Sequence, residues 1–382
     1  MKKERKQFIA FILFGILFLG LTIGNMTKKE KEFSEIENRM LQTRPKITVK
    51  KVLNGTFQKE FEAYLSDQFL WRDRWISYKT KAEQLFGKKE VKNVYLAKDN
   101  YLIEHHKKED LDKKQYKKNT KRIKEVTNKY EKLLGKDRVR VLFVPTASSI
   151  LRDKLPKNAP KDPQNEMLDE WKKVAKEGTF LDIRTLLNEK KDEYIYYKTD
   201  HHWTTLGAYY GYEAWAKSVG IMPEPKENWI KEVVSDEFLG TIYSKIGMAR
   251  EKDRLELWKE KEEGEYEIIY DMGQKTSDTF YEMSYAKKKD KYAVFLDGNH
   301  ALTVVKNKKV KNGRKLVVVK DSYAHCFVPF VAKHFEEVHV IDLRYFNIGI
   351  EPYVKENKIT DFLMLYHVMS YGSDTHTLNL VR

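Results

Sequence analysis

The sequence has little cysteine, proline and glycine: its 382 residues include one cysteine, nine prolines and 18 glycines. A single cysteine excludes a disulfide framework and a cysteine-rich zinc site. The low proline and glycine content excludes a collagen-like or linker-dominated chain. Hydrophobic residues make up 41% and aromatic residues 13% of the sequence, which excludes an intrinsically disordered chain. The length allows one large domain or two modest ones, each with a sizeable core.

Long blocks of one charge sign are also absent. The 72 Lys and Arg residues outnumber the 57 Asp and Glu residues, for a formal net charge of +15, but the two signs are interspersed. A lysine-rich solvated surface is the simplest interpretation, and nucleic acid, anionic lipid or an acidic cell-surface polymer are the partners that this charge would favour. We find no zinc finger, RNA-binding sheet motif or basic-helix heptad pattern that would support nucleic acid.

One long hydrophobic run is present. Residues Gln7–Thr27 carry no charge over 21 positions, and a helix of roughly 20 residues crosses a bilayer core. Lysine and arginine precede the run, which favours a cytoplasmic N-terminus and an exported remainder. A cleaved signal peptide is the alternative, but Gly20–Met26 offers only a poor cleavage site. We therefore expect a retained transmembrane anchor over residues 1–27, which leaves the exported part with a net charge of +12.

The exported part is expected to comprise a lead segment, residues 28–111, and a main domain, residues 112–382. The lead segment is polar and aromatic-rich, with short helices expected at Phe57–Leu65 and Trp75–Leu85. Within the domain, residues 221–290 are charged and tyrosine-rich, and they are interpreted as an insertion or a substrate-facing excursion.

The domain alternates helical and strand patterns. Apolar residues at three- and four-residue steps predict a helix at Asp112–Leu134, ended by Gly135, and a second helix is expected at Leu206–Val219. Five short runs rich in branched residues predict strands: Val139–Val144, Phe180–Ile183, Tyr292–Leu296, Leu316–Val319 and Val338–Ile341. Near-continuous apolar runs indicate strands covered on both faces. We predict an α/β fold, a three-layer α/β/α domain with a parallel sheet.

A serine follows one of these strands. Lys320-Asp321-Ser322-Tyr323 comes directly after Leu316–Val319, and ligands of open α/β sheets lie at the carboxyl ends of the strands. A serine on such a turn points its hydroxyl into the crevice, and the backbone amides there can bind an oxyanion. Taken alone, Asp-Ser is more simply explained as a helix cap.

A second motif is Thr199-Asp200-His201-His202-Trp203. If this stretch is extended, Asp200 and His202 face the same side and His201 faces away. A carboxylate beside an imidazole fixes its tautomer and stabilises the imidazolium that forms when the imidazole takes a proton from serine. Serine needs this help because its hydroxyl is a poor nucleophile. The following Thr204 or Thr205 is expected to cap the next helix.

A surface loop or a metal site would also account for the second motif. His201 and His202 could bind zinc with His300 or His325, but no helical His-x-x-x-His and no dense Cys/His set supports a metal. Cys326 lies in an apolar stretch and is most simply a buried small hydrophobe.

Asp200-His201-His202-Trp203 resembles the signature of the DHHW family, which is related to the alginate O-acetylation proteins AlgJ and AlgX. The likeness extends to further pieces of the chain: Glu37-Asn38-Arg39, Asn54-Gly55, Asp67 with Arg72, Val144-Pro145 and Asp321-Ser322. The resemblance implies an SGNH hydrolase-like domain. It also implies that Ser322 is the nucleophile, His202 the general base and acid, and Asp200 the orienting carboxylate.

Further site residues follow from the resemblance or from their position after a predicted strand or an apolar run. Asn299, with Gly298, is a candidate second oxyanion donor, and Arg344 is placed for substrate contact, with a strand-end salt bridge as the alternative. Tyr323 and Trp203 are also expected to bind substrate. For Tyr366, His367 and Ser370, substrate contact and a purely structural role stay equally open.

The resemblance implies a membrane-anchored O-acetyltransferase of a cell-surface polysaccharide that works through an acyl-serine intermediate. A polytopic membrane-bound O-acyltransferase is the expected partner that supplies acetyl groups. No cofactor, metal or nucleic acid is expected. Two alternatives stay open: an acetylesterase with the same triad, and a non-catalytic polysaccharide-binding component of an envelope complex.

Overall fold

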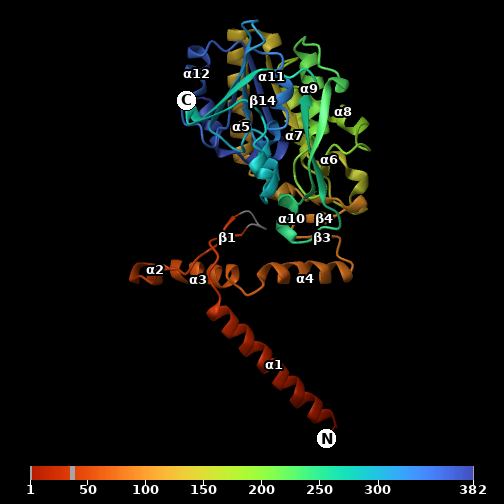
Figure 1. Ribbon diagram of the computed structural model, residues 1–382, viewed down its shortest axis with the longest axis vertical. Helices are drawn as coiled ribbons and strands as arrows, with labels where there is room; N and C mark the ends of the chain where they lie inside the picture. The colour runs from red at the N-terminus through yellow and green to blue at the C-terminus, as the bar shows by residue number, and fades with distance from the viewer. Residues whose placement is uncertain (1, 35–38, 382) are drawn as a thin grey trace. The chain divides into compact units, whose positions relative to one another are not determined.

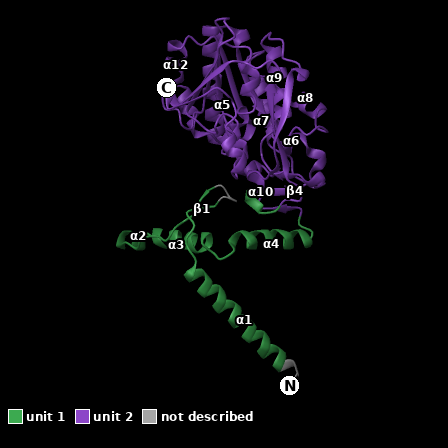
Figure 2. Cartoon of the chain, in the orientation of Figure 1, with its two compact units in different colours: residues 1–88, 244–248 green, residues 89–243, 249–382 purple. Residues whose placement is uncertain are grey.

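A computed structural model of the chain describes residues 2–34 and 39–381. These residues form two compact units, one of residues 1–88 with 244–248 and one of residues 89–243 with 249–382 (Figure 2). Two residues of the N-terminal pattern, Glu37 and Asn38, lie outside the described residues.

Helices dominate the first unit (Figure 1). Its elements are α1 (Lys2–Thr27), β1 (Phe33–Ser34), β2 (Arg39–Met40), α2 (Val49–Leu53), α3 (Thr56–Asp67) and α4 (Arg72–Leu85). Helices α3 and α4 confirm the two helices expected in the lead segment. Helix α2 was not expected; it begins after Thr48, whose side chain accepts a hydrogen bond from the backbone N–H of Lys51, as an N-cap residue does.

Helix α1 is long and apolar enough over Arg5–Thr27 to cross a membrane, and its apolar stretch is not buried against the rest of the protein. It is the one such helix within residues 2–34 and 39–381. Length and composition of this kind are shared by membrane anchors and signal sequences.

A seven-stranded sheet forms the centre of the second unit, in the order β10-β9-β11-β13-β12-β14-β6. The parallel strands are β13 (Glu337–Ile341), β12 (Lys315–Lys320), β14 (Asp361–His367) and β6 (Val139–Val144). The strands β11 (Leu302–Asn307), β9 (Tyr266–Tyr270) and β10 (Lys275–Ser277) extend the sheet with antiparallel pairing. The sheet is therefore mixed, with a parallel part that carries the predicted strands and an antiparallel edge.

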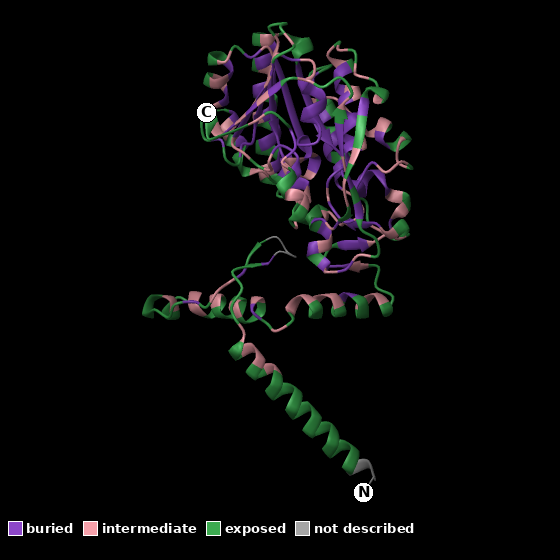
Figure 3. Ribbon diagram, in the orientation of Figure 1, coloured by how far each residue is buried: buried purple, intermediate pink, exposed green. Residues whose placement is uncertain are grey.

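Successive side chains of the parallel strands supply two separate cores. Leu316 and Val318 of β12 belong to one core and Val317 and Val319 to the other, because neighbouring side chains of a strand point to opposite faces. Helices α9 (Thr205–Ser218) and α11 (Val328–Ala332) pack on the first face; α5 (Lys113–Leu134) and α7 (Gln164–Val174) pack on the second. The predicted α/β/α layering is confirmed, and Figure 3 shows the buried residues filling the sheet.

The remaining elements are short. They include the helices α6 (Ala147–Ile150), α8 (Arg184–Glu189), α10 (Thr241–Ile246), α12 (Ile350–Glu356) and α13 (Val368–Ser373). The other strands are β3 (Glu90–Val91), β4 (Val94–Leu96), β5 (Leu102–Glu104), β7 (Trp229–Phe238) and β8 (Asp253–Glu260). The 3-10 helices are η1 (Lys98–Asn100), η2 (Lys108–Asp110), η3 (Lys136–Arg138), η4 (Arg152–Lys154), η5 (Lys226–Asn228), η6 (Asp271–Gly273), η7 (Met283–Lys287), η8 (Lys291–Val294), η9 (Ser322–Ala324) and η10 (Thr375–Leu380).

Both predicted helices of the domain are confirmed. Helix α5 begins after Asp112, whose side chain accepts hydrogen bonds from two backbone N–H groups, and it ends at Gly135, where φ is 100°. Helix α9 begins after Thr204, whose hydroxyl accepts from the backbone N–H of Gly207. Sequence signals at helix ends are reliable here because each cap is a local contact.

Two of the five predicted strands are wrong. Phe180 makes a single bridge to Val141 before the chain turns into α8. Tyr292 belongs to η8, and a turn follows in which Leu296 has a φ of 55°. Both runs are buried core segments, and a short apolar run does not distinguish a strand from another buried segment. The run Phe362–Leu365, not predicted as a strand, is the centre of β14.

Residues 221–290 divide between two sheets. Strands β7 and β8 pair with each other as a separate antiparallel sheet, whereas β9 and β10 belong to the central sheet. The charged composition of the segment does not reveal this division, because β9 pairs with β11, which lies outside the segment, whereas β7 and β8 pair with each other.

We expect Trp171→Ala to destabilise the chain by about 3–5 kcal/mol, the usual effect of removing a buried tryptophan. Trp171 of α7 is fully buried, with ring centroids 5.1 Å from Phe143 and 6.1 Å from Tyr371. Urea unfolding of the full chain measures the loss. The control Met222→Ala, at a side chain that is 85% exposed, should change stability by less than about 0.5 kcal/mol. Equal midpoints for the two variants would contradict this packing.

Candidate active site

The Asp-His motif lies on a tight loop that β8 holds in place. An antiparallel bridge between Tyr196 and Trp203 closes the loop. The buried carboxylate of Asp253 accepts hydrogen bonds from the backbone N–H of Lys198 at 2.6 Å and from the backbone N–H and hydroxyl of Thr199 at 2.7 and 2.5 Å. The segment interpreted as an insertion therefore supplies the residue that shapes this loop.

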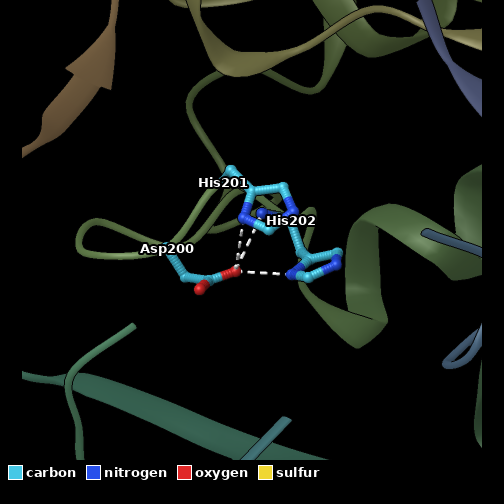
Figure 4. A group of neighbouring side chains, drawn as sticks. All are labelled: Asp200, His201 and His202. Atoms are coloured by element: carbon cyan, nitrogen blue, oxygen red, sulfur yellow. Dashed lines mark hydrogen bonds and ion pairs between the residues drawn. The ribbon is translucent and has the colours of Figure 1, made fainter. Parts of the chain in front are cut away.

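Asp200 is buried, and Figure 4 shows its carboxylate beside the rings of His201 and His202. Its Oδ1 accepts from the backbone N–H of His202 at 3.0 Å and from Nδ1 of His202 at 2.5 Å. Its Oδ2 accepts from the backbone N–H and hydroxyl of Thr241 at 2.8 and 3.0 Å. Burial opposes ionisation, but the neighbouring His202 and His201 and the donors hold the pKa of Asp200 below its ordinary value.

The loop places His201 differently from the prediction. Its Nδ1 lies 3.7 Å from Oδ1 of Asp200, and its ring centroid lies 3.8 Å from that of His202. The expectation that His201 faces away is wrong because the chain bends at every residue from Lys198 to His202, so the alternation of an extended strand does not apply.

Ser322 meets His202 at the carboxyl end of β12. Nε2 of His202 lies 2.8 Å from Oγ of Ser322, which is half-buried. The capping role belongs to Asp321 instead: its Oδ1 accepts from the backbone N–H of Tyr323 at 3.0 Å and its Oδ2 from that of His367 at 2.9 Å. The Ser322 hydroxyl is therefore available to the histidine.

The hydrogen-bond roles follow from the charge of Asp200. An ionised carboxylate only accepts, so Nδ1 of His202 carries the hydrogen and Nε2 is left as the acceptor that faces Ser322. The backbone N–H of Ser322 donates to no acceptor among the described residues, which leaves it available to an anionic oxygen bound beside the hydroxyl.

Tyr292 covers the face of the histidine. Its ring stacks on that of His202 with centroids 3.8 Å apart and planes 11° apart, and its hydroxyl donates to the carbonyl of Ser322 at 3.2 Å. Burial, followed by the charge of His201, lowers the pKa of His202 to about 4, against the opposing effect of Asp200. The imidazole is therefore neutral, and able to accept a proton, at neutral pH.

Two residues expected to bind substrate are fully buried. The indole N–H of Trp203 donates to the carbonyl of Tyr323 at 2.9 Å, and the Tyr323 hydroxyl donates to the carbonyl of His201. A Cβ at Gly211 would lie 2.8 Å from the Trp203 ring, so the glycine allows α9 to pack on the indole. Their burial favours positioning of the Ser322 turn over the predicted contact with substrate.

Asn299 and Arg344 lie together and are exposed. Nη2 of Arg344 donates to Oδ1 of Asn299 at 3.0 Å, and Nε and Nη2 of Arg344 donate to the Asp342 carboxylate at 2.9 and 2.6 Å. The salt bridge at the strand end is thus present. Asp342 also pairs with the buried Nζ of Lys320 at 3.0 Å, which links Arg344 and Asn299 to β12, the strand that ends just before Ser322. Substrate contact by Asn299 and Arg344 stays a prediction.

The three residues with open roles, Tyr366, His367 and Ser370, lie at the end of β14 and just after it. Tyr366 is buried. Nδ1 of His367 accepts from the backbone N–H of Ser370 at 3.3 Å, and burial and the charge of His201 lower the pKa of His367 well below its ordinary value. Two of them contact the Ser322 turn: His367 donates its backbone N–H to Asp321, and the Ser370 side chain also hydrogen-bonds to Asp321.

The structure shows the contacts of the side chains that the alternative zinc site would use. Ligand atoms of Asp200, His201 and His202 lie within 4.8 Å of one another. The two oxygens of Asp200, however, already accept from four N–H and O–H groups, which matches the number of hydrogen bonds that a carboxylate can accept. His300 is paired with Asp271 and Asp297, and His325 with Lys320. The predicted zinc partners are thus engaged elsewhere.

Several site residues were not predicted as such. Tyr292, Thr241 and Asp253 all derive from parts of the sequence without a motif, and nothing in their local pattern marks them as neighbours of Asp200 or His202. Cys326 is buried, as predicted, and burial raises the pKa of its thiol to about 12, so it stays protonated.

The chain matches the family described as DHHW protein over residues 115–341. It belongs to the DHHW family. Among solved structures, a DHHW family protein from Eubacterium siraeum is 24% identical, with a TM-score of 0.63, over 75% of this chain and 94% of that one. Bacillus cereus PatB1, solved with a sulfonyl adduct, is 17% identical, with a TM-score of 0.61, over 74% of this chain and 98% of that one. No curated protein matches the chain significantly.

The O-acetyltransferase domain of Pseudomonas putida AlgJ is also similar, at 13% identity and a TM-score of 0.43, over 74% of this chain and 93% of that one. The DHHW protein and PatB1 share the fold of about three quarters of this chain. Together with the family match, they confirm the predicted family and fold class of this DHHW protein.

The low pKa of His202 predicts how the reactivity of the Ser322 hydroxyl of this DHHW protein depends on pH. We expect the rate at which a sulfonyl fluoride modifies Ser322 to persist as the pH falls through 6.5 and to be half lost near pH 4, where His202 becomes protonated. In Tyr292→Ala, water reaches the imidazole and the burial effect weakens, so the half-loss should move upward toward pH 6.5. A wild-type half-loss at pH 6.5 or above would contradict this account.

Proposed function

We propose that the chain is a membrane-anchored, extracytoplasmic O-acetyltransferase that acts on a polysaccharide. The observation that carries the proposal is the continuous hydrogen-bonded series from Asp200 through His202 to the half-buried Ser322, with distances of 2.5 and 2.8 Å. Such a series is the arrangement that activates a serine for acyl transfer.

In the first half-reaction, Nε2 of His202 takes the proton of Ser322 as its Oγ attacks the acetyl carbonyl. The tetrahedral intermediate collapses to the acetyl-serine ester, and the imidazolium returns its proton to the departing group of the donor. In the second half-reaction His202 takes the proton of a sugar hydroxyl, which attacks the ester. Collapse then releases the O-acetylated sugar, and His202 returns the proton to Ser322.

Asp200 makes this cycle possible in a buried site. Burial alone lowers the pKa of His202 and disfavours the imidazolium. The ionised Asp200 stabilises that cation and holds the ring by Nδ1, so that Nε2 stays aimed at Ser322. Thr241 fixes the other oxygen of the carboxylate and prevents its rotation.

The developing oxyanion requires hydrogen-bond donors. The backbone N–H of Ser322 is one donor in this proposal, and Asn299 with Gly298 is the second. Arg344, bonded to Asn299, would orient both this donor and the incoming sugar. Trp203 and Tyr323 act as positioning residues beneath the turn.

The proposed location of the protein and its net charge both suit a polymer substrate outside the membrane. Helix α1 would hold the chain at the membrane, with the second unit on the extracytoplasmic side. The net charge of +12 beyond residue 27 suits an acidic or modified polysaccharide. Cytoplasmic thioesters do not reach that side, so a membrane-bound O-acyltransferase is the partner we propose as the source of acetyl groups.

We expect Ser322→Ala to abolish the acetyl adduct on the protein and to lower acetyl turnover by about 10⁶-fold. Asp200→Asn should leave the fold intact and lower turnover by about 10⁴-fold, because the wrong histidine tautomer is then favoured. Intact-mass spectrometry and release of product from an acetyl ester provide the measurements. The matched control is Ser373→Ala, at an exposed serine outside the site, which should keep full activity. Full activity in Ser322→Ala would refute the mechanism.

A competition between acceptors separates transfer from hydrolysis. With an acetyl donor and an oligosaccharide, we expect acetylated sugar to exceed free acetate. Free acetate alone would establish the esterase instead. A sulfonyl fluoride, chosen because PatB1 was solved with a sulfonyl adduct, should label Ser322 in the full chain. Absence of labelling in folded protein would favour the non-catalytic polysaccharide-binding alternative.

A further inference from the structure

The first unit exposes a set of large apolar side chains, here called the aromatic face: Trp71, Trp75, Tyr78, Leu85 and Phe86. Their exposed fractions are 57%, 45%, 56%, 88% and 88%, respectively. Soluble surfaces rarely expose so many large apolar groups together, and those that do usually contact something.

The aromatic face is one side of α4 and its two flanking residues. The members from Trp71 to Leu85 recur at four-, three- and seven-residue steps along the helix, a spacing that places them in one stripe. The other side of α4 packs within the first unit: Thr80 is buried and its hydroxyl donates to the carbonyl of Ile246 at 2.7 Å. A helix of a soluble domain buries its apolar stripe, and α4 does the opposite.

The aromatic face is tied to the end of α1. Oδ1 of Asn25, in the last turns of α1, accepts from the backbone N–H of Leu70 at 2.7 Å. Gly24 allows the Leu70 side chain to approach, since a Cβ at that position would lie 2.7 Å from it. The connection between α3 and α4 therefore lies at the end of the apolar span. In a membrane protein, this is the level of the headgroups, where tryptophan and tyrosine concentrate.

Helix α3 and the residues after it expose further apolar side chains. Phe61, Leu65 and Phe69 follow one another at four-residue steps and are 37%, 53% and 40% exposed. Basic residues accompany the apolar groups, since residues 28–88 contain 14 Lys and Arg against nine Asp and Glu. Aromatic side chains with lysine and arginine beside them are typical of helices that lie in the surface of an anionic membrane. Figure 3 shows exposed positions along α1 to α4.

We propose that α3 and α4 lie in the interface of the membrane that α1 enters, with the aromatic face inserted among lipid headgroups and the first acyl carbons. The lysines and arginines would then reach anionic headgroups. The backbone of Trp71 supports a role for this segment, because a tryptophan with a φ of 56° is unfavourable without a compensating contact. The proposal depends on α1 entering a membrane and is independent of chemistry at Ser322.

The distribution of tryptophan provides a direct test. Of the seven tryptophans, the five in the second unit are at most 5% exposed, and none lies in α1. The full chain is reconstituted into phosphatidylcholine and phosphatidylglycerol vesicles whose acyl chains carry bromine close to the headgroup. We expect the bromine to quench a share of the emission that approaches the two-in-seven contribution of Trp71 and Trp75.

Two variants show which tryptophans are quenched. The double variant Trp71→Phe/Trp75→Phe should lose the quenched share, whereas Trp229→Phe, in the second unit, should retain it. Unquenched emission from vesicle-bound protein would overturn the proposal, and unquenched but blue-shifted emission would show that protein covers the face instead. Quenching that persists in the double variant, or failure of the chain to bind vesicles, would also overturn it. Labelling of Ser322 in the same samples reports separately on the proposed function.

Discussion

The candidate active site depends on one buried negative charge. The carboxylate of Asp200 is 2% exposed, and an ionised group at that depth is unstable unless donors surround it. Four hydrogen bonds do so, two from His202 and two from Thr241. Because these donors require the loop to bend tightly, Asp253 holds the loop from β8. The tight shape of the loop thus provides the hydrogen bonds that keep Asp200 ionised.

The same charge sets the properties of the histidine. Stacking on Tyr292 removes His202 from water and favours its neutral form, whereas Asp200 favours the protonated form. A general base needs both effects, since it must be neutral before it takes a proton and stabilised after it has done so. Ser322 completes the set from a different part of the chain. It lies at the end of β12, where Asp321 caps the following turn and leaves the serine hydroxyl to His202.

The first unit distributes its large apolar side chains differently from the second unit. In the second unit the large apolar side chains are buried between the sheet and its helices, whereas α4 exposes Trp75 and Tyr78 and buries Thr80. If α1 enters a membrane, the inverted pattern is what an interfacial helix requires, because its apolar side then meets lipid rather than protein.

The sequence by itself determined what depends on local pattern: the apolar span at Gln7–Thr27, the capped helices α5 and α9, three of the parallel strands, and the two motifs that carry Asp200, His202 and Ser322. It predicted the family from those motifs. The conformation of some buried runs and the contacts between distant segments were decided by the tertiary structure alone. A buried run such as Tyr292–Leu296 is apolar whether it is a strand or a 3-10 helix, so periodicity failed there. The contacts of Tyr292, Thr241 and Asp253 with the motif join segments that are distant along the chain, and the local sequence carries no signal of such contacts. The placement of His201 against His202 likewise came from a loop whose bends are imposed by Asp253 on another strand.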